Sequence, residues 1–127
     1  MSLNLHSVGI FGQTMAECIN TIAGELPTDA VGMWQIIPTG RQEFGLSGDD
    51  LTEFVRRCVL ALLDRGAKPV VGGGGTEYDW LLQLQYGKSN EEIVNAVIRE
   101  WLNSGATDCD PGGLWFALLS PYVGIRR

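Results

Sequence analysis

Residues 47–66, SGDDLTEFVRRCVLALLDRG, carry the clearest structural pattern in the chain. Apolar side chains recur there at the three- and four-residue spacing of one helix face, whereas Glu53 and Arg57 lie four residues apart on the other side. The apolar positions are Leu51, Phe54, Val55, Cys58, Val59 and Leu62. Ser47 and the acids after it open the helix, and Gly66 supplies a left-handed stop. The segment is therefore predicted to be an amphipathic helix with one face in the core.

Two other segments begin with a capping box, in which a hydroxyl and a carboxylate satisfy the first free backbone N–H groups of a helix. One begins at Thr14-Met15-Ala16-Glu17 and stops at Pro27, and the other begins at Ser89-Asn90-Glu91-Glu92 and ends at Gly105. Apolar residues follow both boxes at helical spacing: Met15, Ile19, Ile22 and Leu26, then Ile93, Val94, Val97, Ile98, Trp101 and Leu102. The sequence thus predicts three helices.

Residues 68–86 have the pattern of a β-hairpin. A short apolar strand is expected at 68–71, and residues 78–86 alternate between apolar and polar side chains as a strand does. The link between them is Gly72, Gly73, Gly74 and Gly75, followed by Thr76, and we expect it to be a flexible loop. Further strands are expected at 31–37, 114–119 and 3–11, because these runs are largely apolar and flanked by turn residues.

Helices that alternate with strands, with one hairpin among them, are typical of an α+β protein. We expect a single mixed, largely antiparallel sheet of four to five strands, with about three helices packed on one face in a two-layer arrangement. The half-polar face of the 78–86 strand favours two layers over three. At 127 residues, without a linker or internal repeat, the chain is predicted to be one compact domain over 1–127.

The chain is acidic, with 15 acids against nine bases and a net charge of −6. Duplex nucleic acid is not an expected partner, because neutralising phosphates requires clustered Lys and Arg. Between residues 77 and 110 lie seven acids and two bases, a local charge of −5. Such a stretch can attract a basic protein. The predicted partner-binding residues are Glu77, Asp79, Glu91, Glu92, Asp108 and Asp110.

Metal and cofactor binding are not expected. The three cysteines, Cys18, Cys58 and Cys109, are far apart, and His6 is the only histidine, so they lack the spacing of a zinc site or a disulfide framework. Reduced thiols, together with a start that lacks the pattern of a secretory signal, predict a cytoplasmic protein. No apolar run is long enough for a membrane span, so a membrane is not an expected partner.

Catalytic residues are not predicted either. The glycine run leads into Glu77 and Asp79 and a strand, whereas a phosphate-binding loop leads into Lys and a helix. Cys109 lies between Asp108 and Asp110, whose negative charge disfavours a reactive thiolate. His6 is not part of a recognisable triad motif.

The leading hypothesis is a small non-catalytic binding protein whose acidic surface docks a basic protein, as an inhibitor does. One alternative is a small hydrolase-like or ligand-binding enzyme that uses carboxylates near the Gly72–Gly75 loop, with Glu77 or Asp79 as base and His6 or Tyr78 as helper. A second alternative is a structural subunit whose sheet edge pairs with a copy of itself, as in a homodimer. Whether the acids and His6 converge in space separates the enzyme from the other two.

Overall fold

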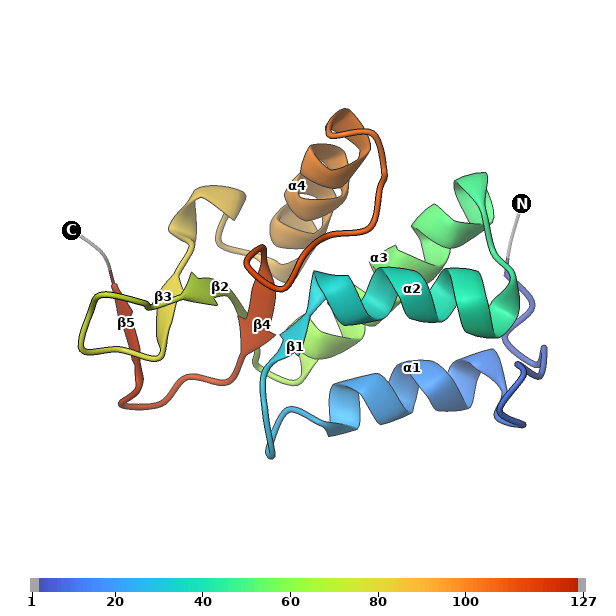
Figure 1. Ribbon diagram of the computed structural model, residues 1–127, viewed down its shortest axis with the longest axis horizontal. Coiled ribbons are helices and arrows are strands. Elements are labelled where there is room, and N and C mark those ends of the chain that lie inside the picture. The colour runs from blue at the N-terminus through green and yellow to red at the C-terminus, as the bar shows by residue number, and fades with distance from the viewer. Residues whose placement is uncertain (1–2, 126–127) are drawn as a thin grey trace.

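The computed structural model describes residues 3–125 as helices that pack against one small sheet (Figure 1). The α-helices are α1 (Met15–Gly24), α2 (Met33–Phe44), α3 (Gly48–Asp64) and α4 (Asn90–Asn103), and a short 3-10 helix, η1, covers Leu84–Tyr86. The strands are β1 (Val31–Gly32), β2 (Lys68–Gly72), β3 (Trp80–Leu82), β4 (Trp115–Ala117) and β5 (Val123–Ile125).

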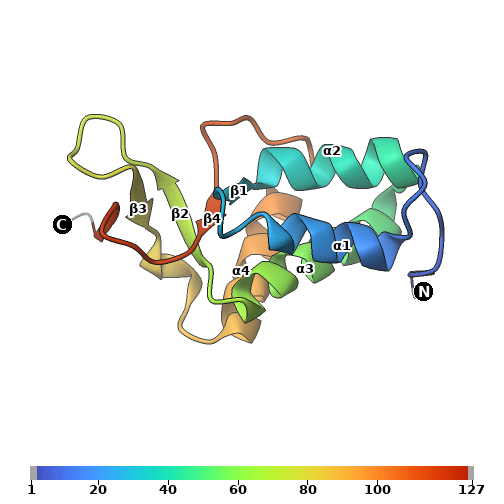
Figure 2. The same ribbon diagram turned by 90° about the horizontal axis from the view of Figure 1, so that it is seen from below.

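All five of these strands join one sheet, in the order β1-β4-β2-β3-β5. Three pairings are antiparallel, and β3 pairs with β5 in parallel. The predicted fold class, a mixed and largely antiparallel sheet in a two-layer α+β fold, is confirmed. Figures 1 and 2 show α1, α2 and α3 gathered beyond the β1–β4 end of the sheet, whereas β3 and β5 project away from them. The two ends of the sheet therefore have different surroundings.

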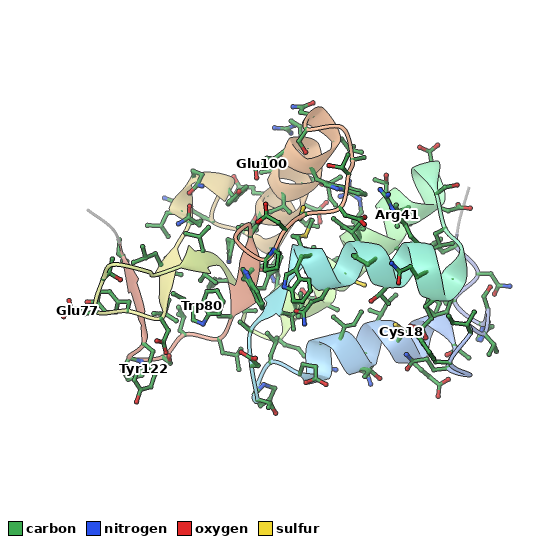
Figure 3. All side chains as sticks on the ribbon, in the orientation of Figure 1. Cys18, Arg41, Glu77, Trp80, Glu100 and Tyr122 are labelled. Atoms are coloured by element: carbon green, nitrogen blue, oxygen red, sulfur yellow. The ribbon has the colours of Figure 1, made fainter. Side chains whose placement is uncertain are left out.

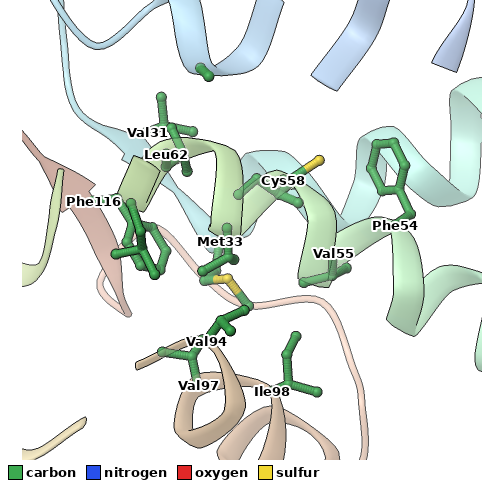
Figure 4. Close-up of a cluster of buried hydrophobic side chains, with 14 of the residues drawn as sticks. Val31, Met33, Phe54, Val55, Cys58, Leu62, Val94, Val97, Ile98 and Phe116 are labelled. Carbon is green, nitrogen blue, oxygen red and sulfur yellow. The ribbon is translucent and has the colours of Figure 1, made fainter. Parts of the chain in front are cut away.

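Helix α3 lies at the centre of the helical layer, because it packs against α1, α2 and α4. Its predicted apolar face is buried throughout, and Phe54, Val55, Cys58, Val59 and Leu62 are each 0% exposed. Side chains of α3 share one buried cluster with Met33 of α2, Val94 of α4 and Phe116 of β4, and Figure 4 shows Phe54 along α3 away from those three. Burying each such side chain contributes about 1.5–3 kcal/mol to folding, so α3 organises the core.

Both predicted capping boxes are present. The Glu17 N–H donates to Thr14 Oγ1 over 3.1 Å, and the Thr14 N–H donates to Glu17 Oε1 over 2.8 Å. At the start of α4, the Glu92 N–H donates to Ser89 Oγ and the Ser89 N–H donates to Glu92 Oε1, each over 3.1 Å. These contacts satisfy backbone donors that have no partner within the helix.

The strand predicted at 31–37 is wrong beyond its first two residues. Only Val31 and Gly32 pair with β4, and the chain then enters the unpredicted helix α2. Met33, Ile36 and Ile37 fit one helix face as well as they fit an apolar strand, so periodicity alone does not separate the two. Gly40 lies where α2 contacts α3, because a Cβ there would lie 2.8 Å from side-chain atoms of Leu51 and Phe54. The missing side chain lets α2 pack closely on α3.

Other strand predictions were too long or misplaced. Residues 3–11 form no strand, and only an isolated bridge joins Val8 to Thr14. The predicted strand at 78–86 is reduced to β3 followed by η1, and the one at 114–119 is reduced to β4. Strand β5 was not predicted. Gln83 explains the early end of β3, since its side chain donates to the Leu81 and Leu82 carbonyl oxygens and thereby turns the chain.

We expect Phe54→Ala to lower the free energy of unfolding by about 3–5 kcal/mol, because it leaves a cavity where α2 meets α3. Leu102→Ala, at a side chain of α4 that is 45% exposed, is the matched control and should cost less than about 1 kcal/mol. Urea denaturation followed by circular dichroism measures both. Equal losses for the two variants would contradict the central position of α3.

Candidate functional site

The six predicted partner-binding acids lie on three separate segments. Glu77 and Asp79 belong to the β2–β3 loop, Glu91 and Glu92 to the first turn of α4, and Asp108 and Asp110 to the loop between α4 and β4. Figure 3 shows Glu77 at one end of the molecule and Arg41, the ion-pair partner of Asp108, towards the other. The structure therefore does not bring the six acids together in one patch.

Three of these carboxylates have local structural partners. Glu92 completes the α4 capping box, and the hydrogen bonds from the Ser89 backbone and hydroxyl hold the pKa of this carboxyl below its usual range. Asp108 lies 3.5 Å from the Arg41 guanidinium, and Asp110 Oδ1 accepts a 2.7 Å hydrogen bond from the Gly112 N–H. Their polar atoms are already engaged within the chain.

Glu77 and Asp79 are exposed, and within residues 3–125 neither carboxylate has a hydrogen-bond or ion-pair partner. The loop that carries them is hydrogen-bonded internally, because the Gly73 N–H donates to the Asp79 carbonyl over 2.9 Å and Thr76 Oγ1 donates to the Gly73 carbonyl over 2.6 Å. A Cβ at Gly73 would collide with the Tyr78 carbonyl, so the closed loop requires this glycine. The flexibility of Gly72–Gly75 stays a prediction.

The loop is joined to the far edge of the sheet. The backbone N–H groups of Asp79 and Trp80 both donate to the Tyr122 carbonyl, over 2.9 and 3.2 Å. The Tyr78 ring lies against Gly124 of β5, where a Cβ would collide with it. These contacts place Glu77 and Asp79 beside strand β5 and the turn before it, as Figure 3 shows for Glu77 and Tyr122.

Two large apolar side chains are exposed along β5 and the turn before it. Tyr122 is 65% exposed and Ile125 is 54% exposed. Together with Glu77 and Asp79 they form what we call the sheet-end surface. Sequence reasoning missed both apolar residues, because β5 was not predicted. The only signal for them is the short apolar run after Pro121, which is too brief to distinguish a strand from a loop.

Three tryptophan rings, those of Trp34, Trp115 and Trp80, pack in sequence beside this surface and stabilise the sheet. Trp115 lies on the face of β4 opposite the buried Phe116, with its ring centroid 6.1 Å from that of Trp34 and 5.0 Å from that of Trp80. Trp101, in contrast, is buried in the helical core. The three half-buried rings hold the β2–β3 hairpin against the β4 end of the sheet.

The thiols are poor nucleophiles. Burial and then the Glu43 carboxylate, whose Oε2 lies 3.9 Å from the sulfur, raise the pKa of Cys18 to about 11. Burial raises the pKa of Cys58 well above its ordinary value, and burial followed by Asp110 and Asp108 raises that of Cys109. Since only the thiolate reacts, all three environments favour the unreactive protonated form.

Glu43 is a buried carboxylate that sequence reasoning did not single out. It is 7% exposed, and its Oε1 accepts a 3.1 Å hydrogen bond from the Gln13 amide. The Glu43 carbonyl also accepts from the Ile10 N–H over 3.1 Å. These bonds attach the N-terminal segment to α2.

Of the groups named for the enzyme alternative, Tyr78 shares the β2–β3 loop with Glu77 and Asp79, but His6 does not approach these carboxylates. His6 is exposed in the N-terminal segment beside α1, whereas Glu77 and Asp79 lie at the opposite end of the molecule (Figures 1 and 3). Within residues 3–125, no three His, Cys, Asp or Glu side chains gather closely enough to hold a metal ion. In the same part of the chain, none of the helices has the length and apolar character needed to cross a membrane.

Comparison of the chain with protein-family models, curated proteins and solved structures found no match. Arguments about function therefore depend on the geometry described above.

We expect iodoacetamide to alkylate Cys109 first, because Cys18 and Cys58 are buried. Asp110→Asn should speed this reaction severalfold at pH 8, since removing a neighbouring negative charge lowers the pKa of Cys109 and increases its thiolate fraction. Mass spectrometry of timed samples measures the rate. Glu91→Gln, which neutralises an acid of α4, is the control, and an equal acceleration in both variants would contradict the local charge effect.

Proposed function

We propose that the protein is a non-catalytic binding protein whose sheet-end surface docks a basic protein segment. The observation that carries the proposal is the combination of two exposed apolar side chains, Tyr122 and Ile125, with two unpartnered carboxylates, Glu77 and Asp79, next to an edge strand. Interfaces that discriminate between partners combine apolar anchors with a charged rim in this way.

Strand β5 supports docking through the backbone. It pairs with β3 on one side and is the last strand in the sheet order, so its other side has no strand partner within residues 3–125. An edge of this kind can accept an extended segment of another chain through main-chain hydrogen bonds, with specificity from the side chains at alternate positions. Tyr122 and Ile125 lie at the two ends of this edge.

The negative charge of the sheet-end surface supports a basic partner segment. Glu77 and Asp79 are free of ion pairs within the described residues, unlike Asp108, and the whole chain has a net charge of −6. A basic segment would gain from these two carboxylates both in the rate of encounter and in orientation. Among the six predicted acids, the proposal therefore depends on Glu77 and Asp79, and contact by the other four stays a prediction.

The separation of His6 from the carboxylates and the protonated state of the thiols favour binding over catalysis. The three cysteines are unpaired in the structure, which agrees with action in a reducing compartment such as the cytoplasm. A protein partner, rather than nucleic acid or a membrane, fits the acidic charge. An alternative occupant of the β5 edge is a second copy of the chain, which would form a homodimer.

The test uses a synthetic nine-residue peptide that alternates Arg or Lys with Val or Phe, and a matched peptide with Glu at the basic positions. We expect the basic peptide to shift amide resonances of residues 73–82 and 120–125, with affinity falling as salt is raised from 50 to 500 mM. Glu77→Gln and Asp79→Asn should each weaken binding by about two- to fivefold, the worth of an exposed ion pair.

Glu25→Gln is the control, because it removes an exposed carboxylate that is not among the six predicted acids. Arg126 and Arg127 follow β5 directly in the sequence, so replacing both with Gln should tighten binding of the basic peptide by removing like charges. Shifts centred elsewhere, or equal binding of the acidic peptide, would refute the proposal. A mass by light scattering that doubles with protein concentration would identify the second copy as the occupant.

A further inference from the structure

Both lysines of the chain, Lys68 and Lys88, line one cavity. The cavity has a volume of about 320 Å³ and lies where the start of β2, the end of β3, η1 and the start of α4 meet. Its walls are otherwise mainly apolar, formed by Pro69, Leu82, Leu84, Ile93 and Leu119. In a chain with 15 acids, not one lining residue is acidic. The cavity is therefore a positively charged apolar site on an acidic protein.

Neither ammonium group has an ion-pair partner in the part of the chain that the structure describes. Within residues 3–125, the ion pairs involve Arg41, Arg56 and Arg57, and neither lysine takes part. Gln83, the other polar side chain of the lining, is already engaged, because its amide nitrogen donates to the Leu81 and Leu82 carbonyls and its Oε1 accepts from Gln85. The lysines are thus the polar side chains of the cavity that are free to contact a ligand.

Part of the apolar wall is open to solvent. Leu84 is 63% exposed and Leu119 is 60% exposed, and both border the cavity. A ligand with an apolar body would cover these side chains and remove their surface from water, which is favourable. Cavities of about 300 Å³ are at the lower end of the range for small-molecule sites, so the body must be small.

The helix start beside the cavity argues for a singly charged ligand. The backbone N–H groups at the α4 N-terminus would ordinarily attract phosphate, but those of Ser89 and Glu92 already donate within the capping box. The Glu92 carboxylate there would also repel a doubly charged group about twice as strongly as a singly charged one. We propose that this cavity binds a small amphipathic carboxylate, with the carboxylate between Lys68 and Lys88 and a short hydrocarbon chain against Leu84 and Leu119.

The test uses octanoate as the probe, at neutral pH and below its micelle concentration. Octanol supplies the same chain without charge, and acetate supplies the charge without the chain. We expect saturable 1:1 binding of octanoate in calorimetry, at least about tenfold tighter than octanol or acetate, since a hydrogen bond to a charged group is worth about that factor. Amide shifts should centre on residues 68–69, 82–88 and 119.

Lys68→Gln and Lys88→Gln should each weaken octanoate binding by about tenfold and leave octanol binding unchanged, whereas Lys88→Arg should retain it. Arg99→Gln is the matched control, because it removes an exposed positive charge outside the cavity. Leu119→Ser should weaken octanoate and octanol alike. Absence of saturable octanoate binding, equal affinity for octanol, or lysine variants that bind like the wild type would each overturn the proposal, which does not depend on peptide docking at the sheet-end surface.

Discussion

Helix α3 has helical neighbours on three sides, and the burial of its apolar face controls where the other elements lie. With Phe54, Val59 and Leu62 fully buried against α1, α2 and α4, the helical layer contains most of the core without help from a large sheet. Only β1 and β4 contribute strand residues, Val31 and Phe116, to this cluster. The sheet can therefore have strands of two to five residues, and its distal end is left free to form surfaces rather than core.

The helices could be predicted from sequence because their signals are local. The hydroxyl and carboxylate of each capping box are three residues apart, as Ser89 and Glu92 are, and the apolar stripe of α3 repeats within single turns. Strand boundaries were harder to predict. Residues 31–37 suit either a helix or a strand, and the observed helix packs on α3 through contacts between separate elements, such as the close approach of Gly40 to Phe54. A local pattern carries no information about that contact.

The candidate site was predicted in its charge but not in its position. A count of acids along residues 77–110 treats neighbours in sequence as neighbours in space, yet α4 separates the loop that carries Glu77 from the loop that carries Asp108. Tyr122 lies beside Asp79 because β5 pairs in parallel with β3, some 40 residues earlier in the chain. A parallel pairing has no tight turn to mark it, so sequence reasoning had no signal for this half of the sheet-end surface.

The two lysines that line the cavity differ from most of the arginines in the contacts that they make. Among the arginines of residues 3–125, Arg41, Arg56 and Arg57 contact carboxylates and Arg65 donates to Asn20, whereas Arg99 makes none of these contacts. The lysines make no such contact, although acids outnumber bases by 15 to nine. A carboxylate held between Lys68 and Lys88 would meet two positive charges beside an apolar wall, whereas Arg99 is a single exposed charge outside the cavity. This physical difference separates the cavity from the rest of the basic residues and favours an external anion as the missing partner.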